Sequence, residues 1–226
     1  MSKALVIFAK APVAGQVKTR LCPPLSPQQA AELARCFLLD SVERACQLPD
    51  VAVYIAFTPA DSEPLFRTLL PFPVSYLPQR GNSLGERELN IFIDLFQHDV
   101  THAVLIGSDI PTLPLSHLHD AFSLLVDPQY DAVFGPSRDG GYYLVGLREA
   151  HTALFENITW STESVMNETL AQARKAGLRI SLVPRWYDVD DRKDLRQLVA
   201  DFRDPQHAKR APRTRALLKR LGLLAK

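Results

Sequence analysis

Hydrophobic residues along the chain form short continuous runs that alternate with stretches in which they recur every three to four positions. The short runs are typical of strands covered on both faces, and the periodic stretches are typical of amphipathic helices. The runs predict strands at 4–9, 51–57, 74–78, 102–107, 131–136, 142–147 and 179–184. The periodic stretches predict helices after Ser26, at 61–70, 86–97, 115–126 and 161–177, and from Asp191 onward.

Several predicted helices carry recognisable end signals. Ser26, Pro27 and Gln29 supply an N-cap, a first-turn proline and a capping-box partner. Asp191 and Asp194 suit the start of the last helix, where acidic side chains complement the helix dipole. Gly177 is a natural residue to follow a helix C-terminus.

The repeated alternation of strands and helices predicts the fold class. It indicates an α/β protein with a mostly parallel, doubly wound sheet and helices on both faces. No internal repeat or low-complexity linker interrupts the 226 residues. We therefore expect a single domain, 1–226, in which residues 203–226 form a basic C-terminal helical tail.

The composition excludes several classes of protein. With 46% apolar and 23% charged residues and a net charge of +1, the chain has no overall field that favours nucleic acid or a membrane. The first apolar run is closed by Lys10 and is too short for a transmembrane segment. The three cysteines follow no metal-ligand spacing, and the six histidines form no constellation. We expect a cytoplasmic protein, with His117 and His119 on a helix surface.

The charge is unevenly distributed along the chain. Residues 203–226 contain eight Lys or Arg and one Asp, and the leucines between 217 and 224 form one apolar helix face. We expect this face to pack on the protein's own domain. Contact with a partner subunit in a homo-oligomer and contact with an anionic lipid surface are the alternatives.

Polar residues gather directly after predicted strands, where open α/β sheets bind ligands. The loop after the first strand holds Lys10, Lys18 and Arg20 around Gly15, which permits backbone conformations closed to other residues. Lys18 and Arg20 suit separate phosphate oxygens. Neither GxxxxGK[ST] nor GxGxxG occurs. A phosphate-binding loop and a solvated basic loop are the two interpretations.

Asp109 follows the strand predicted at 102–107, in the sequence GSDIP. Either Thr112 or Ser116 can cap the next helix, which leaves Asp109 for a ligand. Mg²⁺ and Mn²⁺ prefer carboxylate and phosphate oxygens, so one carboxylate bridged through a metal to a diphosphate is a consistent arrangement. A helix-capping Asp109 is the alternative.

The sequence DVDD at 188–191 brings further carboxylates together. In an extended segment, Asp188 and Asp190 point to one side while Val189 packs inward. Two carboxylates on one face repel each other unless a cation is near, and a metal shared with Asp109 would relieve that repulsion. A purely structural role for the segment is the alternative.

Two other segments are candidates for the site. In RDGGYY, Asp139 precedes Gly140 and Gly141, which allow close approach of a ligand to the backbone. Asp139 suits a general base or a group that orients an acceptor hydroxyl, although a tight turn explains the same residues. Arg87 lies in the flexible segment GNSLGER and faces either the ligand or solvent.

The motifs taken together resemble a known family. FAKAPVAGQVKTRL, SLGER, GSDIP, GPSRDGGYYLVGL, WSTESV and DVDD occur in this order over nearly nine-tenths of the chain. The set is similar to bacterial GT-A-type glycosyltransferases, some of them associated with arsenosugar biosynthesis. It is more remotely similar to the nucleotidyltransferases that make molybdenum-cofactor dinucleotides or activate phospholactate.

This resemblance implies a Rossmann-like nucleotide-diphospho-sugar transferase fold. It implies that the loop with Lys18 and Arg20 holds the nucleotide phosphates, and that Asp109 and Asp190 bind a divalent metal. Asp139, Gly140 and Gly141 would line the sugar or acceptor site. The chain departs from the glycosyltransferases in having one carboxylate, Asp109, in place of a D-x-D pair. It departs from the nucleotidyltransferases in a loop poorer in glycine.

The predicted function is a metal-dependent glycosyltransferase with a nucleotide-diphospho-sugar donor and a small hydroxyl acceptor. Lys18 and the metal would stabilise the leaving diphosphate, and Asp139 would act on the acceptor, so these two residues are the predicted catalytic pair. The alternative is a nucleotidyltransferase that joins an NTP to a phosphorylated small molecule and releases pyrophosphate. A nucleotide-binding or scaffold protein without chemistry ranks third.

Overall fold

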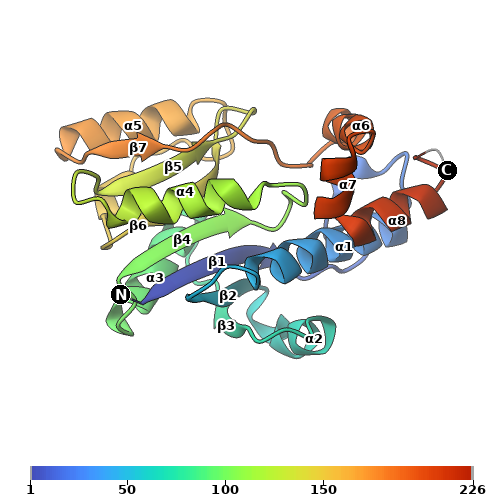
Figure 1. The fold of residues 1–226 in the computed structure, drawn as a ribbon, viewed down its shortest axis with the longest axis horizontal. Coiled ribbons are helices and arrows are strands. Elements are labelled where there is room, and N and C mark those ends of the chain that lie inside the picture. Colours follow the sequence, from blue (N-terminus) through green and yellow to red (C-terminus); the bar gives the residue numbers. More distant parts are fainter. Residues whose placement is uncertain (1, 225–226) are drawn as a thin grey trace.

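A seven-stranded sheet in the order β3-β2-β1-β4-β6-β5-β7 lies at the centre of the computed structural model, which describes residues 2–224 (Figure 1). Residue 1 and residues 225–226, the last two of the predicted tail, lie outside the described residues. β6 runs antiparallel to both of its neighbours, and the remaining strands share one direction. The strands are β1 (Lys3–Lys10), β2 (Val51–Thr58), β3 (Ser75–Pro78), β4 (His102–Gly107), β5 (Ala132–Pro136), β6 (Tyr142–Leu147) and β7 (Ile180–Leu182).

Helices cover both faces of the sheet, which confirms the predicted fold class. They are α1 (Pro27–Ala45), α2 (Glu63–Leu69), α3 (Leu84–Gln97), α4 (Leu115–Val126), α5 (Val165–Lys175), α6 (Arg192–Asp201), α7 (Pro205–Arg210) and α8 (Pro212–Arg220). Side chains of α1, α2 and α4 share one hydrophobic cluster, and those of α3 and α5 share the cluster on the opposite face.

β1 shows why its sequence is a continuous apolar run. Leu5 and Ile7 lie in the cluster under α1 and α4, while Ala4 and Val6 lie in the cluster under α3 and α5. Successive side chains of a strand point to opposite faces, so a strand covered on both sides needs apolar residues at every position.

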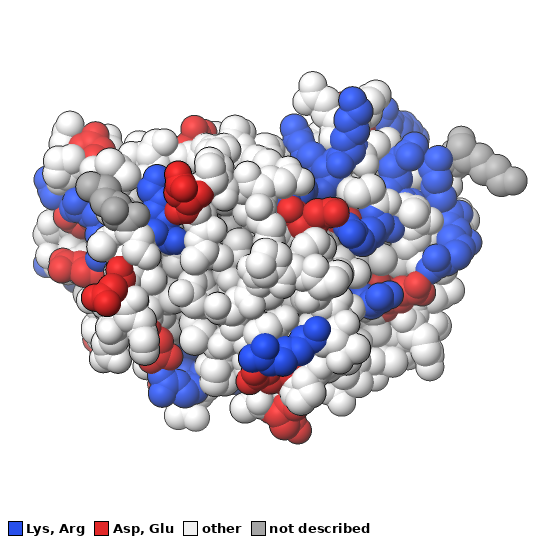
Figure 2. Space-filling model, turned by 60° about the horizontal axis from the view of Figure 1, so that its bottom comes forward, with Lys and Arg blue, Asp and Glu red and all other residues white. Residues whose placement is uncertain are grey.

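The C-terminal helices form a third cluster against α1. Leu217 and Leu218 of α8 are buried there with Leu33 and Phe37 of α1. Asp40 of α1, which is fully buried, accepts hydrogen bonds from the backbone N–H groups of Arg213 and Thr214. The predicted packing of the tail on the rest of the chain is therefore confirmed. Figure 2 shows a group of Lys and Arg side chains at the end of the molecule where Figure 1 places α6, α7 and α8, with others spread over the rest of this face.

The predicted helix starts are partly correct. Capping boxes at Ser26 with Gln29 and at Asp191 with Asp194 are both present. α4 differs, because Pro114 occupies its N-cap position and no side chain caps it, so the predicted caps at Thr112 or Ser116 are wrong. α5 begins at Val165, later than predicted, and it is followed by Gly177 with φ of +71°.

One histidine prediction is also wrong. His117 is buried, and its Nδ1 lies 2.8 Å from the hydroxyl oxygen of Tyr143, whereas His119 is exposed as predicted. Within residues 2–224, no helix has the length and apolar character needed to cross a bilayer.

Candidate functional site

The site lies where the strand order reverses at the carboxyl ends of β1 and β4. After β1 the chain adds β2 and β3 on one side of it, and β4 then returns to pair with β1 on the other side. The loops that leave β1 and β4 diverge at this point, and such a switch point is where open α/β sheets form a ligand crevice.

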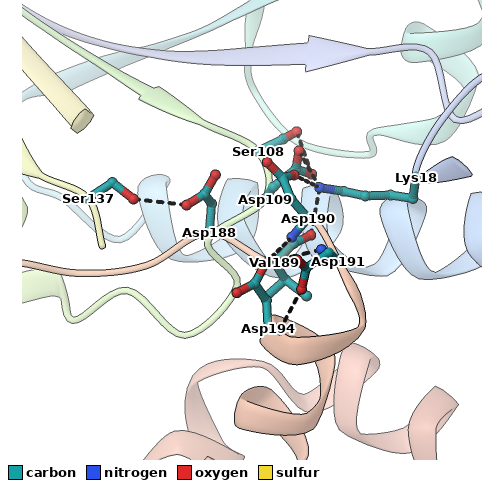
Figure 3. A network of polar contacts seen from close by, with 9 residues as sticks. All are labelled: Lys18, Ser108, Asp109, Ser137, Asp188, Val189, Asp190, Asp191 and Asp194. Carbon is teal, nitrogen blue, oxygen red and sulfur yellow. Dashed lines mark hydrogen bonds and ion pairs between the residues drawn. The ribbon is translucent and has the colours of Figure 1, made fainter. Parts of the chain in front are cut away.

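Lys18 is the central cation of the site (Figure 3). Its ammonium lies 2.7 Å from Asp109 Oδ2 and 2.7 Å from Asp190 Oδ1, and it donates to the carbonyl oxygen of Val189 at 2.7 Å. An ammonium group has three donors, and these contacts use all of them. The residue adopts left-handed backbone angles, φ of 51° and ψ of 35°, as the loop turns into a short 3₁₀ segment.

The charges of this cluster reinforce one another. Burial alone disfavours the charged ammonium, but Asp109 and Asp190 outweigh that effect and raise the pKa of Lys18. Burial likewise disfavours ionised Asp190, and the ammonium of Lys18 outweighs it, so the pKa of Asp190 is lowered. Lys18 and Asp190 therefore form an ionised pair around neutral pH.

The acidic segment before α6 has the predicted alternation. Val189 is fully buried, and its N–H donates to the carbonyl oxygen of Asp109 at 2.9 Å. Asp188 and Asp190 point away from that core, and Ser137 Oγ donates to Asp188 at 2.9 Å (Figure 3). Burial, together with the charges of Asp190 and Asp139, raises the pKa of Asp188 to about 7.

The donor set fits a hard divalent cation only if a ligand completes it. Among residues 2–224, no three His, Cys, Asp or Glu side chains are grouped closely enough to hold a metal by themselves. Mg²⁺ is commonly held by one or two carboxylates plus substrate phosphates, and the neighbouring carboxylates of Asp188 and Asp190 match that pattern. Lys18 lies between Asp109 and Asp190, the pair predicted as metal ligands. Because Lys18 already pairs with Asp109 and Asp190, and Asp188 lies beside Asp190, we add Asp188 to the candidate metal ligands.

Three cavities follow one another past the acidic cluster. Asp109 lines the first and the second, while Asp188 and Asp190 line the second and the third. Their volumes are about 170, 180 and 490 Å³ in that order. The first is also lined by Lys10, Thr58 and Gln79, at the ends of β1, β2 and β3. An elongated ligand in these cavities would pass the carboxylates near its middle.

Of the other predicted phosphate ligands, Arg20 lines one of the three cavities and Arg87 does not. Arg20 is exposed, lines the third cavity, and its positive charge helps to lower the pKa of Asp190. Gly15 adopts φ of +78° with open space around its Cα, so its conformation explains the glycine. Arg87 instead donates to the carbonyl oxygen of Gly81 and is not among the residues that line the three cavities.

The segment around Asp139 both lines the third cavity and forms a tight turn. Asp139 and Gly141 line the third cavity, and Asp139 Oδ1 accepts the N–H of Gly141 at 3.0 Å. Gly140 has φ of +93°, and a Cβ there would lie 2.2 Å from the carbonyl oxygen of Glu163. The space on the Cβ side of Gly140 is thus filled by the protein's own backbone, which explains this glycine without a ligand, and a place for Gly140 in the acceptor site stays a prediction.

Glu88 and Trp160 also line the third cavity, and the sequence-based prediction missed both. A signal for Glu88 was present, because it takes a position on the apolar face of α3 that also carries Ile91, Phe92 and Leu95. An acidic residue on an otherwise apolar helix face is uncommon in a core and indicates a specific partner or ligand.

Comparisons with known proteins place this chain among transferases. Residues 41–162 match the family model described as "Uncharacterized protein conserved in bacteria (DUF2064)". A crystal structure from Desulfovibrio desulfuricans G20, of a protein described as a candidate nucleotide-diphospho-sugar transferase, is 31% identical with a TM-score of 0.84. The match covers 100% of this chain and 99% of that one. No protein of curated function shows significant sequence similarity to the chain.

More distant solved structures share the fold. CMP:2-keto-3-deoxy-manno-octonic acid synthetase in complex with CTP is 15% identical with a TM-score of 0.56, over 87% of this chain and 97% of that one. A manganese complex of Rv0371c from Mycobacterium tuberculosis H37Rv is 14% identical with a TM-score of 0.51, over the same shares of the two chains. These likenesses confirm the predicted Rossmann-like fold.

Proposed function

The chain belongs to the DUF2064 family of bacterial proteins, and from this premise we propose that it is a metal-dependent glycosyltransferase. It would move a sugar from a nucleotide-diphospho-sugar donor to a hydroxyl of a small acceptor. The observation that carries the proposal is the meeting of Lys18, Asp109 and Asp190 at the strand ends, beside three consecutive cavities. The activity named for the Desulfovibrio relative supports it.

In this proposal the nucleoside lies in the cavity at the ends of β1 and β2, and the sugar lies in the cavities beyond Asp188 and Asp190. Mg²⁺ or Mn²⁺, held by Asp190 with Asp188 and Asp109, would neutralise charge on the leaving diphosphate. Lys18 orients Asp109 and Asp190 through its ammonium contacts. Arg20 offers a forked cation toward the phosphates, and exposed Asp139 accepts the proton of the acceptor hydroxyl.

One observation favours a nucleotidyltransferase as the second candidate. Arg20 lines the third cavity beside Asp188 and Asp190, where a phosphorylated co-substrate would need a cation. In that reaction a phosphate of the small molecule attacks the α-phosphate of an NTP, and pyrophosphate leaves. An arsenosugar-type glycosyltransferase is a narrower form of the first candidate, and only the choice of acceptor separates the two.

A thermal-shift panel of nucleoside di- and triphosphates and nucleotide sugars, with and without Mn²⁺, tests both candidates. A ligand at about 100 times its dissociation constant adds roughly 2.7 kcal/mol to the free energy of unfolding, so a true ligand raises the melting temperature clearly. We expect the Mn²⁺-dependent part of the shift to be lost in Asp190→Asn. The products then separate the reactions: free nucleoside diphosphate supports glycosyl transfer, and pyrophosphate supports nucleotidyl transfer. No shift with any nucleotide contradicts both.

A further inference from the structure

Glu88 is a buried carboxyl group placed directly beside the acidic cluster. Its residue is 5% exposed, and its side chain lines both the second and the third cavity together with Asp188 and Asp190. It lies on α3, a helix whose other inward side chains belong to the hydrophobic core. A carboxyl group in such a position costs free energy unless each oxygen has a partner.

Among residues 2–224, only one oxygen of Glu88 has a hydrogen-bond partner. The hydroxyl of Tyr142 donates to Glu88 Oε2 at 2.6 Å, and no group in residues 2–224 donates to Oε1. Oε1 has no hydrogen-bond partner, and it is not fully occluded either, so part of its surface is accessible. Because Glu88 lines the two cavities, that surface opens into them. Oε1 is therefore free to bond a ligand there.

Aromatic side chains form a wall of the third cavity beside this oxygen. The rings of Tyr142 and Trp160 lie 6.3 Å apart between centroids, nearly perpendicular to each other at 79°. Gly85 allows Trp160 to pack against α3, because a Cβ at residue 85 would lie 2.4 Å from the indole ring. An aromatic surface beside a hydrogen-bonding carboxyl group fits a ring with an apolar C–H face and hydroxyls at its edge.

The charge of the third cavity further restricts its occupant. Its lining residues, all within the described chain, include Arg20 as the one cation. The acidic lining residues are Glu88, Asp139, Glu163, Asp188 and Asp190. The phosphate end of a ligand can pair with a metal and with Arg20, but a negative group placed beside Glu88 would meet like charge once Glu88 is ionised, above a pH of about 7.

We propose that Glu88 and Trp160 determine the specificity of the donor-sugar subsite, which accepts an uncharged polyhydroxylated ring. Oε1 of Glu88 hydrogen-bonds a ring hydroxyl, Trp160 covers an apolar face of the ring, and the Tyr142 hydroxyl holds the carboxyl group in place. This inference rests on the proposed glycosyltransferase function, since it places the transferred sugar in this cavity.

Isothermal titration calorimetry of the full chain with Mn²⁺ tests the proposal. The probes are UDP, GDP, UDP-glucose, GDP-mannose and, as the charged probe, UDP-glucuronate. For wild type at pH 8.5, above the pKa of about 7 at which Glu88 ionises, we expect a neutral nucleotide sugar to bind at least about tenfold more tightly than UDP-glucuronate, because the carboxylate would face ionised Glu88. This comparison needs no variant. Equal affinity for the neutral and the charged sugar would overturn the proposal.

Glu88→Gln and Trp160→Phe complete the test. Each should weaken the binding of the neutral nucleotide sugar by about tenfold or more and leave the affinity for the nucleoside diphosphate unchanged. Glu149→Gln, which removes an exposed carboxylate elsewhere, should change neither. If both site variants bind the nucleotide sugar as tightly as wild type does, the assignment of the sugar subsite to Glu88 and Trp160 is wrong, while the proposed function stands. If wild type binds none of the nucleotides, the proposed function fails and the subsite with it.

Discussion

Val189 donates its backbone N–H to the carbonyl oxygen of Asp109 at 2.9 Å, which joins the segment before α6 to the loop after β4. The same Val189 accepts from Lys18 through its own carbonyl oxygen. Backbone contacts therefore fix the places from which Asp109 and Asp190 project, and one ammonium group then orients both carboxylates. A site supported in this way is held in one geometry before any ligand arrives.

Removal of the ammonium group should damage both stability and function. In Lys18→Met, Asp109 and Asp190 face each other without their counter-ion. Breaking a fully buried ion pair costs about 3–5 kcal/mol, but the two Asp side chains are 33% and 44% exposed, so we expect about 2 kcal/mol. Urea denaturation measures this loss, and the proposed transferase activity should fall by about 100-fold.

Lys10→Met is the matched control, because Lys10 is a lysine of the same loop region but is exposed. Its free energy of unfolding should stay within about 0.5 kcal/mol of wild type. A Lys18→Met protein as stable as Lys10→Met and as active as wild type would show that the ammonium bridge has no role in the site.

Glu88 should make stability fall with pH in the neutral range. Burial raises the pKa of Glu88 to about 7 from an ordinary value of 4.5. Between these values the folded protein keeps a proton that the unfolded chain releases, so the stabilisation present below pH 4.5 is lost as the pH rises through 7. The loss amounts to about 3 kcal/mol, and Glu88→Gln should abolish it.

Urea denaturation of wild type and Glu88→Gln across this pH range measures the difference directly. Other groups, such as Asp188, titrate in both proteins and cancel in the comparison. The difference in free energy of unfolding should favour Glu88→Gln increasingly as the pH rises. Glu149→Gln, with a side chain 76% exposed, should follow the wild-type curve. Parallel curves for wild type and Glu88→Gln would mean that Glu88 ionises in the folded protein as readily as in the unfolded chain.

Much of the fold could be predicted because its signals are local. Apolar runs specify β1 and β4, and the capping boxes at Ser26 and Asp191 need only residues three positions apart. The alternation in the acidic segment placed Asp188 and Asp190 on one side for the same reason. The bounds of α4 were predicted correctly, but its cap was not, because Pro114 occupies the N-cap position and no side chain caps the helix.

The parts of the site that escaped prediction depend on contacts between distant segments. Lys18 suggested a phosphate ligand, but its three donors are taken by residues that follow different strands. Gly140 suggested room for a ligand, but the backbone of Glu163 fills the space on its Cβ side, so packing alone already requires the glycine. Glu88 was hidden by its helical neighbours, since only the cavity reveals why a carboxyl group lies on an apolar face.

The attachment of α8 to the rest of the chain should depend on Asp40. No side chain of its own caps the N-terminus of α8, and Asp40 of α1 accepts the N–H groups of Arg213 at 3.1 Å and Thr214 at 2.8 Å instead. Asp40→Ala leaves both groups unpaired and opens a small cavity, so we expect a loss of about 2 kcal/mol. Burial raises the pKa of Asp40, which shows that ionisation already costs energy and argues against a larger loss.

Limited trypsin digestion measures this attachment directly, because residues 203–224 are rich in Lys and Arg and become substrates once α8 separates from α1. Asp40→Ala should be cut in this segment about 30-fold faster than wild type, because with fast opening the population of the open form rises about tenfold for each 1.4 kcal/mol of lost free energy. Glu43→Ala is the control. Glu43 binds the same Arg213, but its side chain is 41% exposed, so this variant should lose less than about 0.5 kcal/mol of the free energy that holds α8 in place. Equal cleavage rates for the two variants would show that α8 is held by its leucines alone, and that the buried carboxylate of Asp40 contributes nothing to its attachment.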